Sequence, residues 1–120
     1  MDRTRILVAD DEEGIRESLS LILGDDYELV FAHDGEETLA QLSKETFGLA
    51  LLDVKMPKLD GLEVLRRLKG SKQSTPVVVL TAYQSVELAR EAVKLGARTY
   101  LPKPFEREQV LDAVKAILGQ

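Results

Sequence analysis

Three blocks of four consecutive apolar residues constrain the fold of this chain more than any other feature. Residues 6–9, 49–52 and 77–80 read Ile-Leu-Val-Ala, Leu-Ala-Leu-Leu and Val-Val-Val-Leu. Blocks this short, rich in branched side chains, are typical of strands buried on both faces, as in a parallel sheet. Residues 28–32 and 99–101 are two weaker strand candidates. Together these segments predict a buried five-stranded sheet.

Between the blocks, apolar residues recur with the spacing of one helix face. The stripes are Ile15, Leu19, Ile22 and Leu23; Leu39 and Leu42; Leu62, Leu65 and Leu68; Val86, Ala89, Ala92 and Val93; and Val110, Val114, Ile117 and Leu118. Gly24, Gly70 and Gly96 stand where the C-terminal ends of helices are expected. Strands that alternate with helices predict a parallel sheet covered on both sides. We therefore expect a single α/β domain over residues 1–120.

Several function classes are excluded by residue types that are absent or rare. The chain has no cysteine, which excludes disulfide scaffolds, thiol nucleophiles, iron–sulfur clusters and thiolate zinc sites. Its single histidine, His33, excludes a multi-histidine metal site. The net charge of −5 argues against direct nucleic-acid binding, which needs a basic face. No apolar run is long enough for a membrane span or a signal-peptide core, so we expect a cytoplasmic protein.

Acidic residues follow the first and third predicted strands, and ligands of parallel α/β sheets bind beyond the carboxyl ends of the strands. Residues 10–13 read Asp-Asp-Glu-Glu, and Asp53 follows the third strand. Acidic residues before a helix also fit simple helix capping, and that alternative stays open. The acidic run excludes a phosphate-cradling nucleotide or flavin loop. If the first and third strands are neighbours, Asp10, Asp11 and Asp53 converge and favour Mg²⁺.

A hydroxyl and a cation follow the last two predicted strands. Thr81 comes directly after residues 77–80, and Lys103 stands between Pro102 and Pro104. Each alone fits an ordinary hydrogen-bonding or solvent-facing residue. However, the two prolines restrict the backbone, so we expect Lys103 to be directed at the site. The order acid-acid, acid, hydroxyl, lysine indicates a site that holds a phosphoryl group on a carboxylate.

These residues together resemble the receiver domain of bacterial two-component response regulators, along residues 5–117. The motifs that carry the resemblance are residues 6–12, residues 51–57, Asp60-Gly61, Leu80-Thr81-Ala82 and Lys103-Pro104-Phe105. Residues 81–83 with 92–97 are most similar to receivers of nitrogen-regulation-type transcriptional activators. The resemblance implies a flavodoxin-like (βα)5 fold, a doubly wound five-stranded parallel sheet with strand order 2-1-3-4-5.

The resemblance also implies a phosphoacceptor and a metal site. Asp53 would take the phosphoryl group. Asp10, Asp11, Asp53 and the backbone carbonyl of Lys55 would bind Mg²⁺, Asp11 more directly than Asp10.

A conformational switch is implied in the same way. Thr81 and Lys103 would bind the phosphoryl oxygens, and the peptide bond after Lys103 is commonly cis in the family. Tyr100 stands at the switch position and would turn inward as Thr81 moves toward the phosphate. Lys55 and Tyr83 lie where family members vary and where the lifetime of the phosphoryl group is tuned.

The expected function is therefore a phosphorylation switch. A sensor histidine kinase would phosphorylate Asp53, and the change would reach the face formed by the fourth helix, fifth strand and fifth helix, residues 84–119. That face would control an output domain or effector protein. Formation of a homodimer through the same face is a further possibility. The domain would not be an enzyme beyond self-phosphorylation from small donors and self-dephosphorylation.

Two alternatives remain open. The first is a Mg²⁺-dependent phosphohydrolase with an aspartyl-phosphate intermediate, although Lys55 stands where such enzymes usually carry a second acid. The second is a stand-alone receiver used only for protein interaction.

Overall fold

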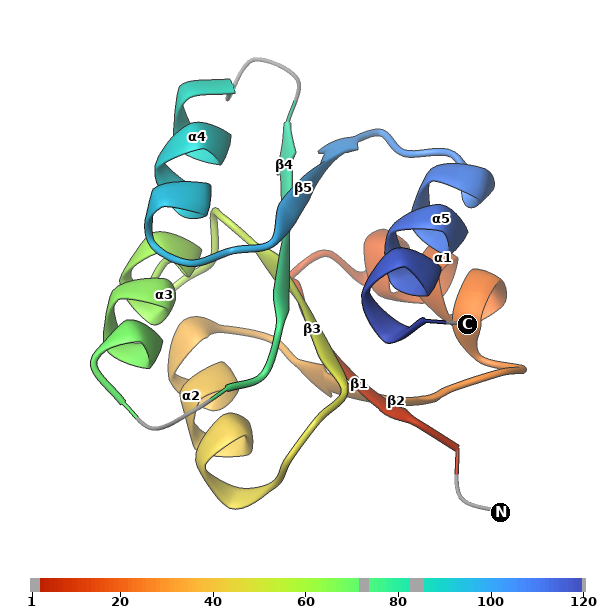
Figure 1. Ribbon diagram of the computed structural model, residues 1–120, viewed down its shortest axis with the longest axis horizontal. Helices are drawn as coiled ribbons and strands as arrows, with labels where there is room; N and C mark the ends of the chain where they lie inside the picture. The colour runs from red at the N-terminus through yellow and green to blue at the C-terminus, as the bar shows by residue number, and fades with distance from the viewer. Residues whose placement is uncertain (1–2, 72–73, 83–85, 120) are drawn as a thin grey trace.

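The computed structural model describes residues 3–71, 74–82 and 86–119. Strands and helices alternate along these stretches (Figure 1). They are β1 (Arg5–Ala9), α1 (Glu13–Leu23), β2 (Glu28–Ala32), α2 (Gly35–Lys44), β3 (Leu49–Asp53), α3 (Gly61–Lys69), β4 (Val77–Ala82), α4 (Val86–Lys94), β5 (Thr99–Lys103) and α5 (Arg107–Leu118). Tyr83 and the first two residues of the expected output face, 84 and 85, lie outside the described residues.

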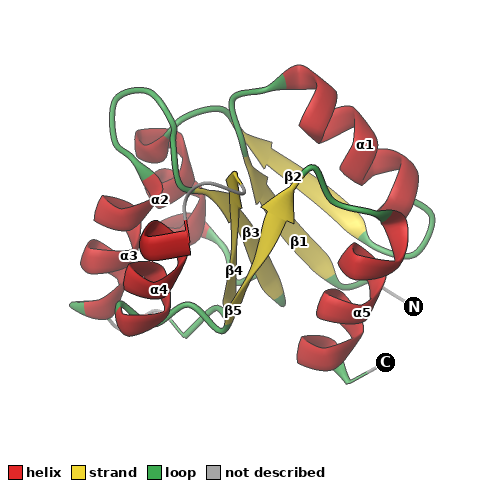
Figure 2. Cartoon of the chain, turned by 90° about the horizontal axis from the view of Figure 1, so that it is seen from above, coloured by secondary structure: helices red, strands yellow, loops and turns green. Residues whose placement is uncertain are grey.

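The strands form one parallel sheet in the order β2-β1-β3-β4-β5, which confirms the predicted topology. Helices α1 and α5 cover one face, and α2, α3 and α4 cover the other (Figure 2). The chain winds outward in both directions from the β1–β3 pair. Because the order reverses there, the carboxyl ends of β1 and β3 border the crevice in which ligands of such sheets bind.

Side chains of the central strands alternate between two hydrophobic cores. In β1, Ile6 and Val8 pack on the α1/α5 side, whereas Leu7 and Ala9 pack on the α2/α3/α4 side. All four are fully buried. Each large apolar side chain buried in this way contributes roughly 1.5–3 kcal/mol to the free energy of unfolding. The continuous apolar blocks of the sequence therefore exist because both faces of each strand need a hydrophobic residue.

The edge of the sheet opposite to the carboxyl ends is tied together by Arg5. Its Nε lies 2.7 Å from Glu28 Oε2 on β2, and its Nη1 pairs with Glu45, which follows α2. The guanidinium also lies 5.5 Å from the centre of the Phe47 ring, a cation–π contact. One side chain thus connects β1, β2 and the segment that leads into β3.

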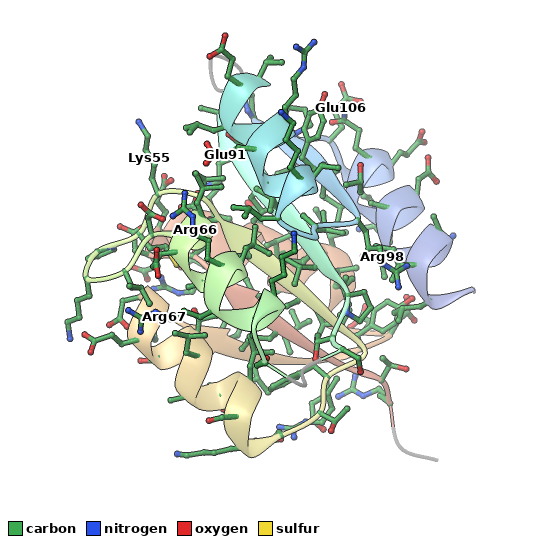
Figure 3. The ribbon with its side chains drawn as sticks, turned by 60° about the vertical axis from the view of Figure 1, so that its left-hand side comes forward. Lys55, Arg66, Arg67, Glu91, Arg98 and Glu106 are labelled. Carbon is green, nitrogen blue, oxygen red and sulfur yellow. The ribbon has the colours of Figure 1, made fainter. Side chains whose placement is uncertain are left out.

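Helices α3 and α4 are linked across their exposed surfaces. Arg66 of α3 and Glu91 of α4 lie side by side (Figure 3), with Nη2 and Oε1 3.1 Å apart. Arg66 Nη1 also lies 3.2 Å from Glu63 Oε1 on its own helix. Both side chains of the interhelical pair are 46% exposed, so this link is worth at most about 1 kcal/mol.

Within residues 3–71, 74–82 and 86–119, no helix has the length and apolar character needed to cross a membrane.

Candidate functional site

The carboxyl ends of four neighbouring strands bring the predicted site residues to one edge of the sheet. Asp10 directly follows β1, Asp53 ends β3, Thr81 lies near the end of β4, and Lys103 ends β5. Together with Asp11, the aspartates form a cluster in which one carboxylate oxygen from each lies within 4.8 Å of the others. The convergence expected from the sequence is therefore present.

Asp10 is held in place by hydrogen bonds to its backbone and to its carboxylate. Its N–H donates to Ala32 O (3.1 Å), and its carbonyl accepts from Arg16 Nη1 (3.0 Å). Its Oδ1 accepts from the N–H of Glu12 (2.9 Å). The residue is fully buried, and this burial raises the pKa of the Asp10 carboxyl above its ordinary value.

Lys103 is the cation that faces the acidic cluster. Its Nζ lies 2.8 Å from Asp10 Oδ2, 3.2 Å from Asp53 Oδ2 and 3.2 Å from Glu12 Oε1. Burial by itself lowers the pKa of Lys103, but its close contact with Asp10 and the charges of Asp53 and Asp10 outweigh burial and raise the pKa. Lys103 is therefore firmly protonated. The Lys103–Pro104 peptide bond is cis, as expected.

Lys103 and Asp10 form an ion pair without a well-oriented hydrogen bond. Among the described residues, Asp10 Oδ2 accepts no hydrogen bond of favourable angle, although Lys103 Nζ lies only 2.8 Å away. The buried oxygen thus retains unused acceptor capacity. A second cation at this edge could use it, which fits a metal ion bound between the aspartates.

Asp53 belongs to the same cluster and is 5% exposed. Its Oδ1 accepts from the N–H of Lys55 (3.3 Å), and its Oδ2 pairs with Lys103. Burial, reinforced by the charge of Asp10, raises the pKa of Asp53 to about 6, against the opposing effect of Lys103. The ionised form of the Asp53 carboxylate is therefore destabilised in the folded chain, and an additional positive charge nearby would stabilise it.

The loop between β3 and α3 is fixed closely against the site. Asp60 caps α3 by accepting from the N–H of Glu63 (2.9 Å), and the Gly61 N–H donates to Val54 O (2.7 Å). A Cβ at Gly61 would lie 2.3 Å from Asp53 O. Only glycine lets α3 start this close to the backbone of Asp53. The Asp60-Gly61 motif therefore positions the acidic edge.

A second glycine seats the same loop on α2. A Cβ at Gly35 would lie 2.0 Å from Leu59 O, so a side chain there would displace the loop. Lys58 adopts φ 68°, a left-handed conformation unusual outside glycine. Its Nζ lies 3.7 Å from Oδ2 of Asp34, the N-cap of α2.

The strand ends surround an open cavity of about 330 Å³. Its lining consists of Asp11, Glu12, Asp53, Val54, Lys55, Thr81, Ala82 and Lys103. Thr81 is 4% exposed and lies on the same rim as Lys103. The side chain of Lys55 projects away from the loop after β3 (Figure 3). Tyr100 of β5 does not join this group, and its side chain is directed outward with 42% exposure.

Glu12 is the site residue to which the sequence assigned no role of its own. It occupies the N-cap position of α1, but its side chain reaches Lys103 instead of capping the helix. The capping interpretation of the acidic run is therefore wrong for Glu12, while Glu13 does lie in the first turn of α1. The run of four acidic residues indicates that Glu12 belongs to the site, but its partner Lys103 lies 91 residues away in the sequence.

Comparison with known proteins shows which family this chain resembles. Residues 6–115 match the response regulator receiver domain. Response regulator MprA of Mycobacterium tuberculosis is 44% identical over 115 residues, which cover 95% of this chain and 50% of MprA. The chain thus spans half the length of the curated relatives that it matches.

Solved structures agree. NtrX from Brucella abortus superposes with a TM-score of 0.90 at 31% identity, over 98% of this chain and 27% of NtrX. The chemotaxis protein CheY4 of Vibrio cholerae superposes with a TM-score of 0.87 at 34% identity, over 97% of this chain and 99% of that protein. With the parallel sheet and the acidic edge already established, these matches show that the chain belongs to the response regulator receiver domain family.

Proposed function

We propose that Asp53 accepts a phosphoryl group from the phosphohistidine of a sensor histidine kinase. The observation that carries the proposal is the position of Asp53 in the cavity, nearly buried and within 3.2 Å of Lys103 Nζ. In this proposal a carboxylate oxygen of Asp53 forms the new bond to phosphorus. The phosphorus–nitrogen bond breaks, and its electron pair stays on the imidazole of the kinase.

Lys103 and Thr81 would stabilise the transferring group. Phosphoryl transfer spreads negative charge over three oxygens in a loose transition state, so positioning and charge neutralisation do most of the work. Lys103 supplies a largely buried positive charge, and Thr81 supplies a hydroxyl donor on the same rim. The N–H of Lys55 already donates to Asp53 Oδ1 and keeps the carboxylate in one orientation.

The donor set fits Mg²⁺. Asp10, Asp11 and Asp53 offer clustered carboxylate oxygens, Asp10 Oδ2 keeps unused acceptor capacity, and the backbone carbonyl of Lys55 would complete the ligands. Hard oxygen donors in this number suit Mg²⁺, which also keeps bound waters. When bound, the ion would neutralise negative charge on the phosphoryl oxygens.

The output face is proposed to be α4, β5 and α5. Three large apolar side chains are exposed on it: Val86 (48%), Val93 (45%) and Tyr100 (42%). Phosphorylation adds negative charge that would draw Thr81 toward the phosphate, and the outward-directed Tyr100 would then turn into the vacated space. Such a change shifts the population between two conformations. An output domain, an effector or a second copy of the chain would bind one of the two conformations more tightly.

Family membership supports the remaining expectations. We propose that residues 1–120 form one receiver domain of a cytoplasmic two-component system, with an output domain or separate effector as its partner. Self-phosphorylation from small donors and self-dephosphorylation would be its only chemistry.

The proposal is tested by incubating the protein with Mg²⁺ and acetyl phosphate and measuring the mass of the intact protein. One added phosphoryl group is expected, and it should be absent in Asp53→Asn and retained in Asp112→Asn, which alters an exposed acid on α5. Equal labelling of Asp53→Asn would show that Asp53 is not the acceptor. Multiple turnover on a phosphomonoester would favour a phosphohydrolase, and failure to bind Mg²⁺ in a calorimetric titration would favour a receiver used only for protein interaction.

A further inference from the structure

Glu12 is placed where it can compete for the cation of the site. Its Oε1 lies 3.2 Å from Lys103 Nζ, and its backbone N–H donates to Asp10 Oδ1 at 2.9 Å. The side chain of Glu12 is 62% exposed, whereas that of Lys103 is 14% exposed. Glu12 therefore reaches from the rim of the cavity inward to a nearly buried ammonium group.

The ammonium group of Lys103 is surrounded by carboxylates and donates a hydrogen bond to Glu12 Oε1. A lysine offers three N–H donors, and Nζ faces three carboxylates, those of Asp10, Asp53 and Glu12. A phosphoryl oxygen that binds Lys103 beside Asp53 would therefore compete with these carboxylates and displace the hydrogen-bonded one, Glu12. The displacement has to precede or accompany transfer, because Asp53 is still a carboxylate until the new bond forms.

The three partners differ in how readily they can leave. Asp10 is fully buried, and without Lys103 it would be an unpaired charge inside the protein, which is strongly unfavourable. Asp53 is the reacting group and must remain in place. Glu12 is mostly exposed, so its carboxylate can turn into water at little cost.

We propose that Glu12 is a positioning residue that occupies Lys103 in the resting protein and must release it before Asp53 can be phosphorylated. This inference rests on the proposed function of Asp53 and adds a restraint on its rate. Glu12 acts through Lys103 and does not touch the phosphoryl group. Removing its charge frees one donor of Lys103 in advance.

The test compares three variants of the full chain. Glu12→Gln removes the charge that faces Lys103, and Glu12→Asp keeps the charge but shortens the side chain by one methylene. Glu13→Gln is the matched control, because it removes one charge from the adjacent exposed residue in the first turn of α1. The rate of Asp53 phosphorylation in Mg²⁺ is measured with acetyl phosphate and with phosphoramidate, which carries less negative charge.

Glu12→Gln and Glu12→Asp are both expected to raise the rate about two- to fivefold with either donor, the range that corresponds to a partly exposed ion pair. Glu13→Gln is expected to leave it unchanged. The affinity for beryllofluoride, measured by NMR titration without any turnover, should rise by a similar factor in the two Glu12 variants. Circular dichroism confirms that each variant is folded.

Two outcomes would overturn the inference. If Glu12→Gln and Glu13→Gln raise the rate equally, and more for acetyl phosphate than for phosphoramidate, general repulsion of the donor is the cause. If Glu12→Gln leaves both the rate and the beryllofluoride affinity unchanged, Glu12 does not restrain Lys103. In either case the parent chain is still phosphorylated, whereas failure of the proposed function would appear as no labelling of the parent at all.

Discussion

Replacing Asp53 with asparagine is expected to stabilise the metal-free protein, although Asp53 is the proposed reacting residue. The pKa of Asp53 is about 6 in the folded chain and 3.8 in the reference state. A difference of about two units corresponds to about 3 kcal/mol, because each unit is worth about 1.36 kcal/mol. The folded state binds the proton more tightly, so stability is highest at low pH and is lost as the pH rises through about 6. Asparagine resembles the neutral form and avoids this loss.

The gain depends on pH in a way that identifies its cause. Linkage between the two pKa values gives a gain of about 3 kcal/mol at pH 7.5, about half of that at pH 5, and less than about 1 kcal/mol at pH 4. We would measure it by urea unfolding in EDTA, followed by circular dichroism. Asp112→Asn is the control and should change the free energy of unfolding by less than about 0.5 kcal/mol. A gain for Asp53→Asn that is absent at pH 7.5, or equally large at pH 4, would refute the reasoning.

Three further perturbations test other parts of the structure. Gly35→Ala should destabilise the fold by about 1–3 kcal/mol, because its Cβ would lie 2.0 Å from Leu59 O. The control Gly14→Ala, in α1 with open space around the Cβ, should leave the free energy of unfolding unchanged or raise it by up to about 1 kcal/mol. Similar urea midpoints for the two variants would contradict this expectation. Arg66→Gln should cost less than about 1 kcal/mol through its exposed pair with Glu91, and a cost that persists in about 0.5 M NaCl would show that charge is not the cause. Mg²⁺ at ten times its Kd should add about 1.4 kcal/mol to the stability of the parent, reversed by EDTA, and an unchanged melting temperature would count against the metal site.

The sheet and the location of the site could be predicted because both depend on local patterns. The apolar blocks identify buried strands, and the parallel topology brings every strand end to the same edge. Strand ends were less predictable. The blocks stop at Leu52, Leu80 and Leu101, whereas β3, β4 and β5 continue to Asp53, Ala82 and Lys103, because backbone pairing does not end where apolar side chains end.

Close tertiary contacts could not be predicted from the same patterns. The contact of Glu12 with Lys103 depends on the direction of two side chains 91 residues apart. The approach of Gly35 to Leu59 depends on how the β3–α3 loop folds back on α2. Neither has a periodic signature in the sequence. The metal ligands and the roles of Thr81 and Tyr100 stay predictions.

The cluster around Arg5 has a consequence for how this domain can change over time. Strand β1 rises about 3.3 Å per residue, so its five residues separate Arg5 from Asp10 by more than about 13 Å. Effects of substitutions at such separations, without shared partners, are usually additive. Stability lost through crowded carboxylates at one edge can therefore be recovered by better pairing of Arg5, Glu28 and Glu45 at the other. Heat tolerance and signalling rate can diverge independently among related receivers.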